Sequence, residues 1–139
     1  MKIFVTAGTG FVGSAITKML LSRGHDVTSL VRNPEKAKNL KELGVTLVVG
    51  DMLRPESYRQ EVQHHDVIIH CAQLTVKGRY TTKAKHRINE ADQLMTRALA
   101  EDCWQYDKKL LYTSGCFNYG DHGDAWITED TPANPSPLG

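Results

Sequence analysis

The chain has 139 residues and a formal net charge of +1 at pH 7, with 40% hydrophobic and 24% charged residues. This mix is typical of one globular domain and excludes a disordered or fibrous protein. The small net charge gives no reason to expect binding to nucleic acid or to a membrane surface. No apolar run reaches the length of about 18 residues that crosses a membrane, and the first residues do not resemble a signal peptide. The three widely spaced cysteines are expected to be reduced thiols in a cytoplasmic protein.

Hydrophobic patterns along the chain predict strands that alternate with helices. Strands are expected at residues 3–5, 27–31, 45–49, 66–71 and 110–113, and helices at 11–23, 34–43, 55–63 and 83–106. This alternation predicts an α/β fold of the Rossmann type: a doubly wound parallel sheet of five strands in the order 3-2-1-4-5 with flanking helices. Residues 115–139 hold four glycines and three prolines without periodicity, and an irregular C-terminal loop is expected there.

Two of the expected helices carry an apolar face. In the first helix, Val12, Ile16, Met19 and Leu20 recur at helical spacing and are expected to face the core. The long helix carries a longer stripe, made of Ile88, Ala91, Met95, Ala98 and Leu99. The helix after the second strand should begin at Pro34, with Asn33 as its N-cap.

The turn after the first strand contains the pattern G-x-G-x-x-G, at Gly8, Gly10 and Gly13. A side chain at Gly10 would stand between the backbone and a pyrophosphate, and one at Gly13 would push the helix away from the strand. Free backbone N–H groups from Thr9 to Val12 would point at the anion, aided by the helix dipole. The pattern follows a strand and opens a helix, so it predicts a dinucleotide-binding turn. The alternative is a plain glycine-rich turn without a ligand.

With this turn in place, the chain resembles the extended, NAD-dependent epimerase/dehydratase branch of the short-chain dehydrogenase/reductase superfamily. The family's turn reads T-G-x-x-G-x-x-G. Thr6, Gly10 and Gly13 match it, whereas Ala7 stands at the first glycine, a departure that a negative φ would accommodate. The likeness continues through Asp66–Gln73, Thr113-Ser114-Gly115, Tyr119-Gly120 and Glu129–Pro135, and it covers essentially the whole chain.

The resemblance implies a cofactor site and names its residues. Residues 1–114 would form the NAD(P)-binding domain, with Asp51 and Met52 at the adenine and the loop after the fourth strand along the ribose and phosphates. Asn89 matches the family's structural asparagine, although Asp92 and Gln93 stand where Gly-Thr normally follows. The expected cofactor-binding residues are therefore Gly8, Thr9, Gly10, Phe11, Val12, Gly13, Arg32, Asp51, Met52, Cys71, Ala72, Gln73 and Asn89.

The end of the second strand bears on the choice between NAD and NADP. An acid there would bind both ribose hydroxyls, and a basic residue would pair with a 2′-phosphate. The sequence reads Leu30-Val31-Arg32-Asn33, with no acid at that point. A guanidinium can bind phosphate through two hydrogen bonds. NADP is therefore favoured over NAD, and the alternative is that Arg32 is an ordinary solvated charge.

The family transfers a hydride at the nicotinamide, using a Tyr-x-x-x-Lys pair and a Ser or Thr that orients the substrate carbonyl. Ser114 matches that hydroxyl. The tyrosine is either replaced by Leu138 or lies beyond Gly139, and both readings leave this chain without a general acid. Family members are about twice as long, so residues 115–139 are expected to be a loop cut short. The polypeptide is expected to bind a dinucleotide without turning over a substrate nucleotide sugar or carbonyl compound by itself.

Other chemically tempting residues have plainer readings. His64, His65, His70 and Cys71 lack the spacing of a zinc site, and Cys116 has no base placed beside it by the sequence. Tyr112 is expected in the core rather than in catalysis. A basic run before the long helix is expected to be a solvated face, with contact to cofactor phosphate or an acidic substrate as its alternative: Lys77, Arg79, Lys83, Lys85 and Arg87.

Two further alternatives stay open at this point. Some superfamily members bind NADP without the tyrosine and lysine and report redox state to a partner, and this chain could be such a sensor. A third reading is a shortened gene product that keeps the fold but no activity. The family resemblance also implies a possible homodimer formed through the helix at 83–106.

Overall fold

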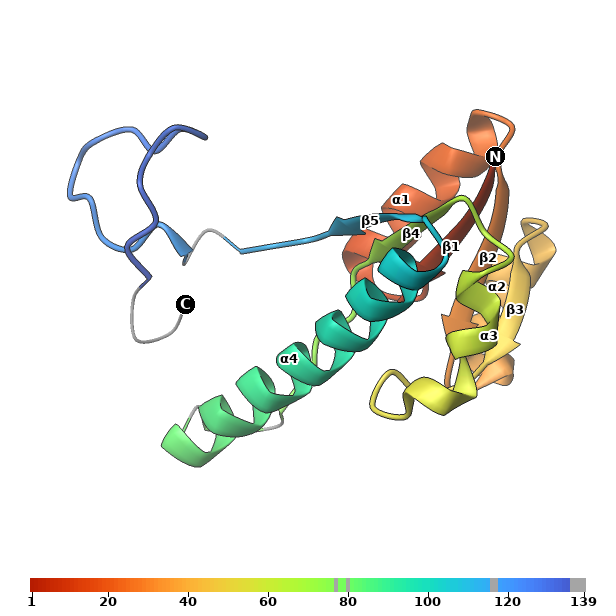
Figure 1. Ribbon diagram of the computed structural model, residues 1–139, viewed down its shortest axis with the longest axis horizontal. Coiled ribbons are helices and arrows are strands. Elements are labelled where there is room, and N and C mark those ends of the chain that lie inside the picture. Colours follow the sequence, from red (N-terminus) through yellow and green to blue (C-terminus); the bar gives the residue numbers. More distant parts are fainter. Residues whose placement is uncertain (77, 80, 116–117, 136–139) are drawn as a thin grey trace.

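The protein folds around one sheet of five parallel strands (Figure 1). The strands are β1 (Lys2–Thr6), β2 (Asp26–Val31), β3 (Thr46–Val49), β4 (Val67–His70) and β5 (Lys109–Tyr112). Their order is β3-β2-β1-β4-β5, and every neighbouring pair is parallel, which confirms the predicted topology. The computed structural model describes residues 1–76, 78–79, 81–115 and 118–135. Because the winding reverses between β1 and β4, their carboxyl ends form the switch point at which such sheets bind ligands.

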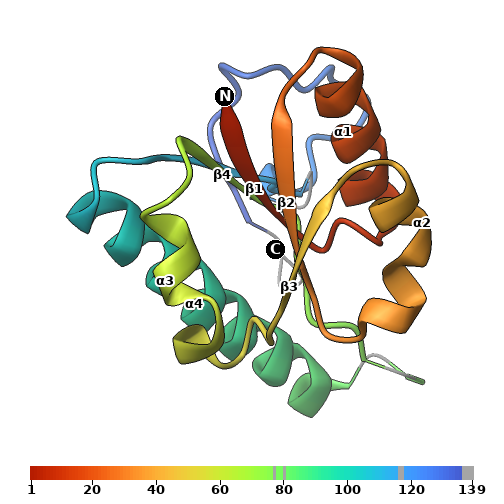
Figure 2. The same cartoon turned by 90° about the vertical axis from the view of Figure 1, so that its right-hand side faces the viewer.

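Helices cover both faces of the sheet, as Figure 2 shows. One face carries α1 (Phe11–Ser22) and α2 (Lys38–Glu42), and the other carries α3 (Arg59–Val62) and α4 (Thr82–Gln105). The two shorter predicted helices each begin with a 3₁₀ turn, at η1 (Pro34–Ala37) and η2 (Pro55–Ser57). Asn33 caps η1 as predicted, since its Oδ1 accepts a hydrogen bond of 2.9 Å from the Glu35 N–H.

The core has two layers because side chains alternate across the sheet. Ile3 and Val5 of β1 pack toward α1 and α2, whereas Phe4 packs toward α3 and α4. The predicted stripe of α4 is confirmed, with all five of its members buried: Ile88, Ala91, Met95, Ala98 and Leu99. These two layers hold the strand ends in fixed positions.

The predicted face of α1 is only partly correct. Ile16 and Leu20 pack against the core, but Val12 and Met19 are each 47% exposed. The residues of α1 that are buried are Gly13 and Thr17. The helix turns this face inward because Gly13 lies against the carbonyl group of Ala7, where a Cβ would meet the Ala7 carbonyl carbon at 2.8 Å. Close approach of the helix to the turn therefore outweighs burial of Val12.

An ion pair ties α3 to α4 beneath the sheet. The Arg59 Nε lies 2.9 Å from Asp102 Oδ1, and Asp102 is only 2% exposed. Burial raises the pKa of the Asp102 carboxyl, and the hydrogen bond from Arg59 partly offsets that rise. The pair satisfies a carboxylate that would otherwise be buried without a partner.

The chain beyond β5 runs away from the sheet (Figure 1). Among residues 113–115 and 118–135, hydrogen-bonded turns are present but neither an α-helix nor a strand is found. One such turn joins the Ala125 N–H to the His122 carbonyl at 3.2 Å. Within the described ranges, no helix has the length and apolar character needed to cross a membrane.

Candidate functional site: a pocket at the switch point of the sheet

A pocket of about 200 Å³ opens at the carboxyl ends of the strands. Of the residues expected to bind a cofactor, those that line it are Thr9, Arg32, Asp51, Met52, Ala72 and Gln73. The sequence analysis missed the remaining lining residues, which are Ala7, Leu30, Val31, Leu53, Leu74, Thr75 and Met95. Most of these are neighbours of predicted site residues along the chain. Met95 differs, because it comes from the buried stripe of α4 and reaches the pocket only through the packing of that helix.

The glycine turn connects β1 to α1. Gly10 is the N-cap of α1, and its N–H donates to the Ala7 carbonyl at 2.8 Å. A Cβ at Gly10 would lie 3.2 Å from that same carbonyl oxygen, and a Cβ at Gly13 would overlap it. Among the described residues, no backbone acceptor is found for the N–H groups of Phe11 and Val12. The first turn of α1 therefore offers free donors beside the pocket.

Ala7 stands where the family pattern has glycine, and a negative φ was expected to make this alanine acceptable. That expectation is wrong, because Ala7 has φ +53°. This is the left-handed region, which costs an L-residue roughly 1–2 kcal/mol. The turn imposes this conformation because the Ala7 carbonyl must accept from Gly10 while Gly13 packs against it. Gly8 has a separate reason to be glycine: a Cβ there would lie 3.2 Å from Cβ of the buried Ser29.

Thr6 joins the glycine turn to the loop after β4. Its Oγ1 accepts hydrogen bonds from the Cys71 N–H at 3.0 Å and from the Ala72 N–H at 3.1 Å. With both lone pairs used, the hydroxyl hydrogen is free to donate to His70 Nδ1, which lies 2.9 Å away. Cys71 therefore supports the site through its backbone, although its side chain does not line the pocket.

His70 is completely buried at the end of β4. Because Nδ1 accepts from Thr6, the proton of the neutral ring sits on Nε2, and no partner for Nε2 is found among the described residues. Burial lowers the pKa of His70, although the carboxylate of Asp92 opposes that shift. The ring is therefore held neutral, as this hydrogen-bond arrangement requires.

Arg32 and Asp51 face the pocket from neighbouring strand ends. Arg32 directly follows β2, and its guanidinium has no ion-pair partner among the described residues. Asp51 shapes the loop after β3, since its Oδ1 accepts from the Leu53 N–H at 3.0 Å and its own N–H donates to Ser57 Oγ at 2.9 Å. Within the described residues, the pocket thus combines the unpaired guanidinium of Arg32 with a loop after β3 that the hydrogen bonds of Asp51 hold in place.

Several predicted residues lie away from the pocket lining. Phe11 is 95% exposed, and Asn89 is exposed on α4. Ser114 is exposed just beyond β5, while its neighbour Thr113 bonds to the His70 carbonyl through Oγ1 at 2.6 Å. Cys116 and Leu138 lie outside the described residues.

Tyr112 is not a core residue, contrary to the expectation from its strand position. It is 44% exposed, and its hydroxyl donates to the Asp92 carboxylate at 3.1 Å. Its ring centroid lies 5.5 Å from that of His70. β5 is the edge strand of the sheet, with β4 as its only strand neighbour among the described residues, so its side chains are less covered than those of β4.

The histidines suspected of metal binding have other contacts. His65 Nδ1 lies 2.6 Å from the Glu61 carbonyl oxygen and its ring packs against Phe4, while His70 pairs with Thr6. Within the described part of the chain, no group of three or more metal-ligating side chains is found.

The parallel sheet, its switch-point pocket and the glycine turn define a Rossmann-type fold. The chain belongs to the NAD dependent epimerase/dehydratase family, whose model matches residues 3–138. The fold is shared with UDP-glucose 4-epimerase from Bifidobacterium longum, solved with NAD+ and UDP. That similarity has a TM-score of 0.84 at 24% identity and covers 99% of this chain and 44% of the epimerase.

Curated relatives support the same family. A 2-alkyl-3-oxoalkanoate reductase of Shewanella oneidensis is 41% identical over 131 residues, which are 93% of this chain and 32% of the reductase. Epimerase family protein YfhF of Bacillus subtilis is 33% identical over 136 residues, covering 94% of this chain and 43% of that protein. The chain therefore spans less than half the length of these relatives.

Proposed function

We propose that this chain is the dinucleotide-binding portion of an extended short-chain dehydrogenase/reductase and that it prefers NADP(H) to NAD(H). The observation that carries the proposal is the pocket at the switch point, which the glycine turn and Arg32 both line. The turn fits a pyrophosphate, because Gly10 and Gly13 leave the backbone bare and the N–H groups of Phe11 and Val12 are free. The cofactor would supply hydride transfer.

Arg32 supports the preference for the 2′-phosphate. The residue follows β2, where the adenosine ribose lies in folds of this type. Its charge is unpaired among the described residues, and Asn33 follows it without adding an acid. Asp51 and Met52, on the next loop, would contact the adenine as the family resemblance implies.

Calorimetric titration of the chain with NADPH and with NADH tests this proposal. We expect NADPH to bind more tightly, and Arg32→Ala to weaken NADPH by about tenfold, because one charge-assisted contact to an exposed phosphate is lost. NADH affinity should change less than twofold. Arg23→Ala, another exposed arginine at the far end of α1, serves as the matched control. Tighter NADH binding, or no effect of Arg32→Ala, would contradict the NADP preference, and no binding of either nucleotide would refute the function.

We further propose that the 139-residue polypeptide does not catalyse turnover alone. No tyrosine in the sequence is followed four residues later by lysine, so the proton-donating pair of the family is missing from these residues. Ser114 would orient a substrate carbonyl. Incubation with NADPH and a panel of ketones, aldehydes and nucleotide sugars is expected to give no sustained oxidation above background.

We also propose that the protein is located in the cytoplasm and that it forms a homodimer through α4.

A further inference from the structure

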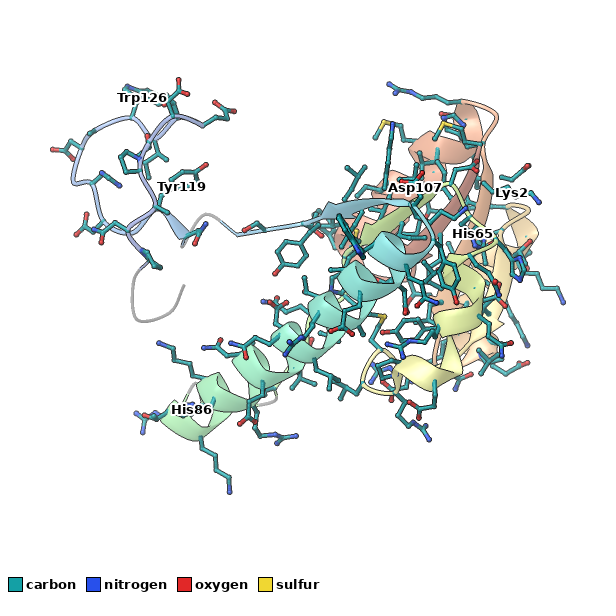
Figure 3. The ribbon with its side chains drawn as sticks, viewed as in Figure 1. Lys2, His65, His86, Asp107, Tyr119 and Trp126 are labelled. Carbon is teal, nitrogen blue, oxygen red and sulfur yellow. The ribbon has the colours of Figure 1, made fainter. Side chains whose placement is uncertain are left out.

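A second hollow, of about 290 Å³, lies at the amino-terminal end of α4. Its lining residues are Thr75, Val76, Arg79, Thr81, Lys83, Ala84 and Arg87. Figure 3 labels His86 in this part of α4, which projects beyond the sheet with its side chains spread outward. Lys83 and Arg87 are four residues apart and therefore share one side of the helix. Arg79 approaches the same hollow from the preceding loop.

The charge of this hollow is concentrated and uncompensated. Residues 75–89 include five lysines and arginines and no aspartate or glutamate, in a chain whose net charge is only +1. The ion pairs found in the described ranges join Lys38 to Glu35, Arg59 to Asp102 and Arg97 to Glu101, so none uses Arg79, Lys83 or Arg87. Three unpaired cations around one concavity repel one another and create a positive potential that an anion would relieve.

The helix end itself is already capped. Thr81 Oγ1 accepts a hydrogen bond of 3.2 Å from the Ala84 N–H, as an N-cap does. The positive character of the hollow therefore comes from side chains rather than from open amides alone. Because guanidinium and ammonium groups supply donors without acceptors, the hollow suits phosphate or carboxylate oxygens.

The position of the hollow relative to the first pocket indicates which anion it would take. Thr75 lines both, so the two adjoin. A dinucleotide whose pyrophosphate lies at the turn after β1 has its adenosine half over β2 and β3, beside Arg32 and Asp51. Gln73, Leu74 and Thr75 line this same pocket from the loop after β4. The hollow therefore opens directly beside the pocket proposed for the dinucleotide, and a molecule bound there would lie next to the cofactor.

We propose that Arg79, Lys83 and Arg87 form a binding site for the anionic group of the substrate, which is thereby a compound that carries a phosphate, diphosphate or carboxylate. This inference rests on the proposed function, because it places a substrate beside a bound dinucleotide. It assigns a role to the basic run that the family resemblance leaves unassigned. The cations hold the anionic end of the substrate and leave its reactive carbon free to approach the cofactor.

Inorganic pyrophosphate is a suitable probe, titrated into the chain at saturating NADPH and followed by amide chemical shifts in NMR spectra. We expect shifts centred on residues 75–87. Lys83→Ala and Arg87→Ala should each weaken the binding of pyrophosphate about fivefold, and the double variant should weaken it about 20-fold. High salt should also reduce the affinity markedly, because it screens the charges. Lys85→Ala removes the same charge from the same helix without lining the hollow, and it should change the affinity less than twofold.

Three results would overturn this inference. Pyrophosphate could leave the shifts of the saturated chain unchanged, or Lys85→Ala could weaken it as much as Arg87→Ala does. Alternatively, Lys83→Ala and Arg87→Ala could weaken the binding of NADPH fivefold, which would assign the hollow to the phosphates of the cofactor. The same titration without NADPH separates the two proposals, because a chain that fails to bind any dinucleotide can still show the dependence on Lys83 and Arg87.

Discussion

At the scale of single residues, Ala7 adopts a backbone conformation that alanine rarely takes, because the turn after β1 requires it. The backbone needs a left-handed residue after β1, and the sequence supplies alanine where the family pattern has glycine. Its carbonyl oxygen is the acceptor for Gly10 and the surface against which Gly13 packs. Strain at such a position persists only where surrounding contacts determine the conformation.

Ala7→Gly is expected to stabilise the protein by about 0.5 kcal/mol, because relief of the left-handed strain exceeds the entropy that glycine loses on folding. Urea denaturation followed by circular dichroism measures the difference. Ala15→Gly, on the exposed side of α1, is the control and should instead destabilise by about 1 kcal/mol. If both variants lowered the free energy of unfolding equally, position 7 would carry no strain.

At the scale of elements, the hydroxyl of Thr6 links β1, β4 and the loop after β4 through three hydrogen bonds. The link depends on the protonation of His70, whose Nδ1 must stay an acceptor. The same residue is the register partner of Tyr112, which bonds to Asp92 on α4. The end of β5 and the loop after β4 are therefore positioned by one continuous set of contacts.

The lowered pKa of His70 predicts how stability depends on pH. Protons bind His70 more readily in the unfolded chain, where its pKa is near 6.5, than in the folded one. The contribution of neutral His70 is therefore complete above pH 6.5 and is lost as the pH falls below that value. Denaturation curves between pH 7 and pH 5 should show a larger loss for the wild type than for His70→Asn.

His64→Asn is the matched control for this comparison, because His64 is exposed and does not line the pocket at the switch point. Its pH dependence should follow that of the wild type. Parallel curves for the wild type and His70→Asn would show that His70 is not the group responsible.

At the scale of the whole molecule, α4 has an uncovered outer surface. Trp104 is 90% exposed and Leu94 is also exposed on the same helix. Exposed apolar side chains on a surface helix favour association. This arrangement supports the proposed homodimer through α4.

Light scattering over a range of protein concentrations is expected to show a mass that rises toward twice 15.5 kDa. Trp104→Ala and Leu94→Ser should shift this transition to higher concentration by about tenfold, as the loss of a buried aromatic contact does. Trp126→Ala, an equally exposed tryptophan in the C-terminal segment, should leave it unchanged. A constant mass of one chain would contradict the dimer.

The sequence by itself determined the α/β class, because apolar periodicity is a short-range signal, and the position of the glycine turn, because residues without a Cβ recur there at fixed spacing. The strand order followed from the alternation of strands and helices, which favours the doubly wound arrangement. The sequence also indicated the buried stripe of α4. Only the tertiary structure decided the inward face of α1, the φ of Ala7, the exposure of Tyr112 and the place of Met95 in the pocket. Each of these depends on how closely two elements approach, and that distance is set by contacts between residues far apart in the chain.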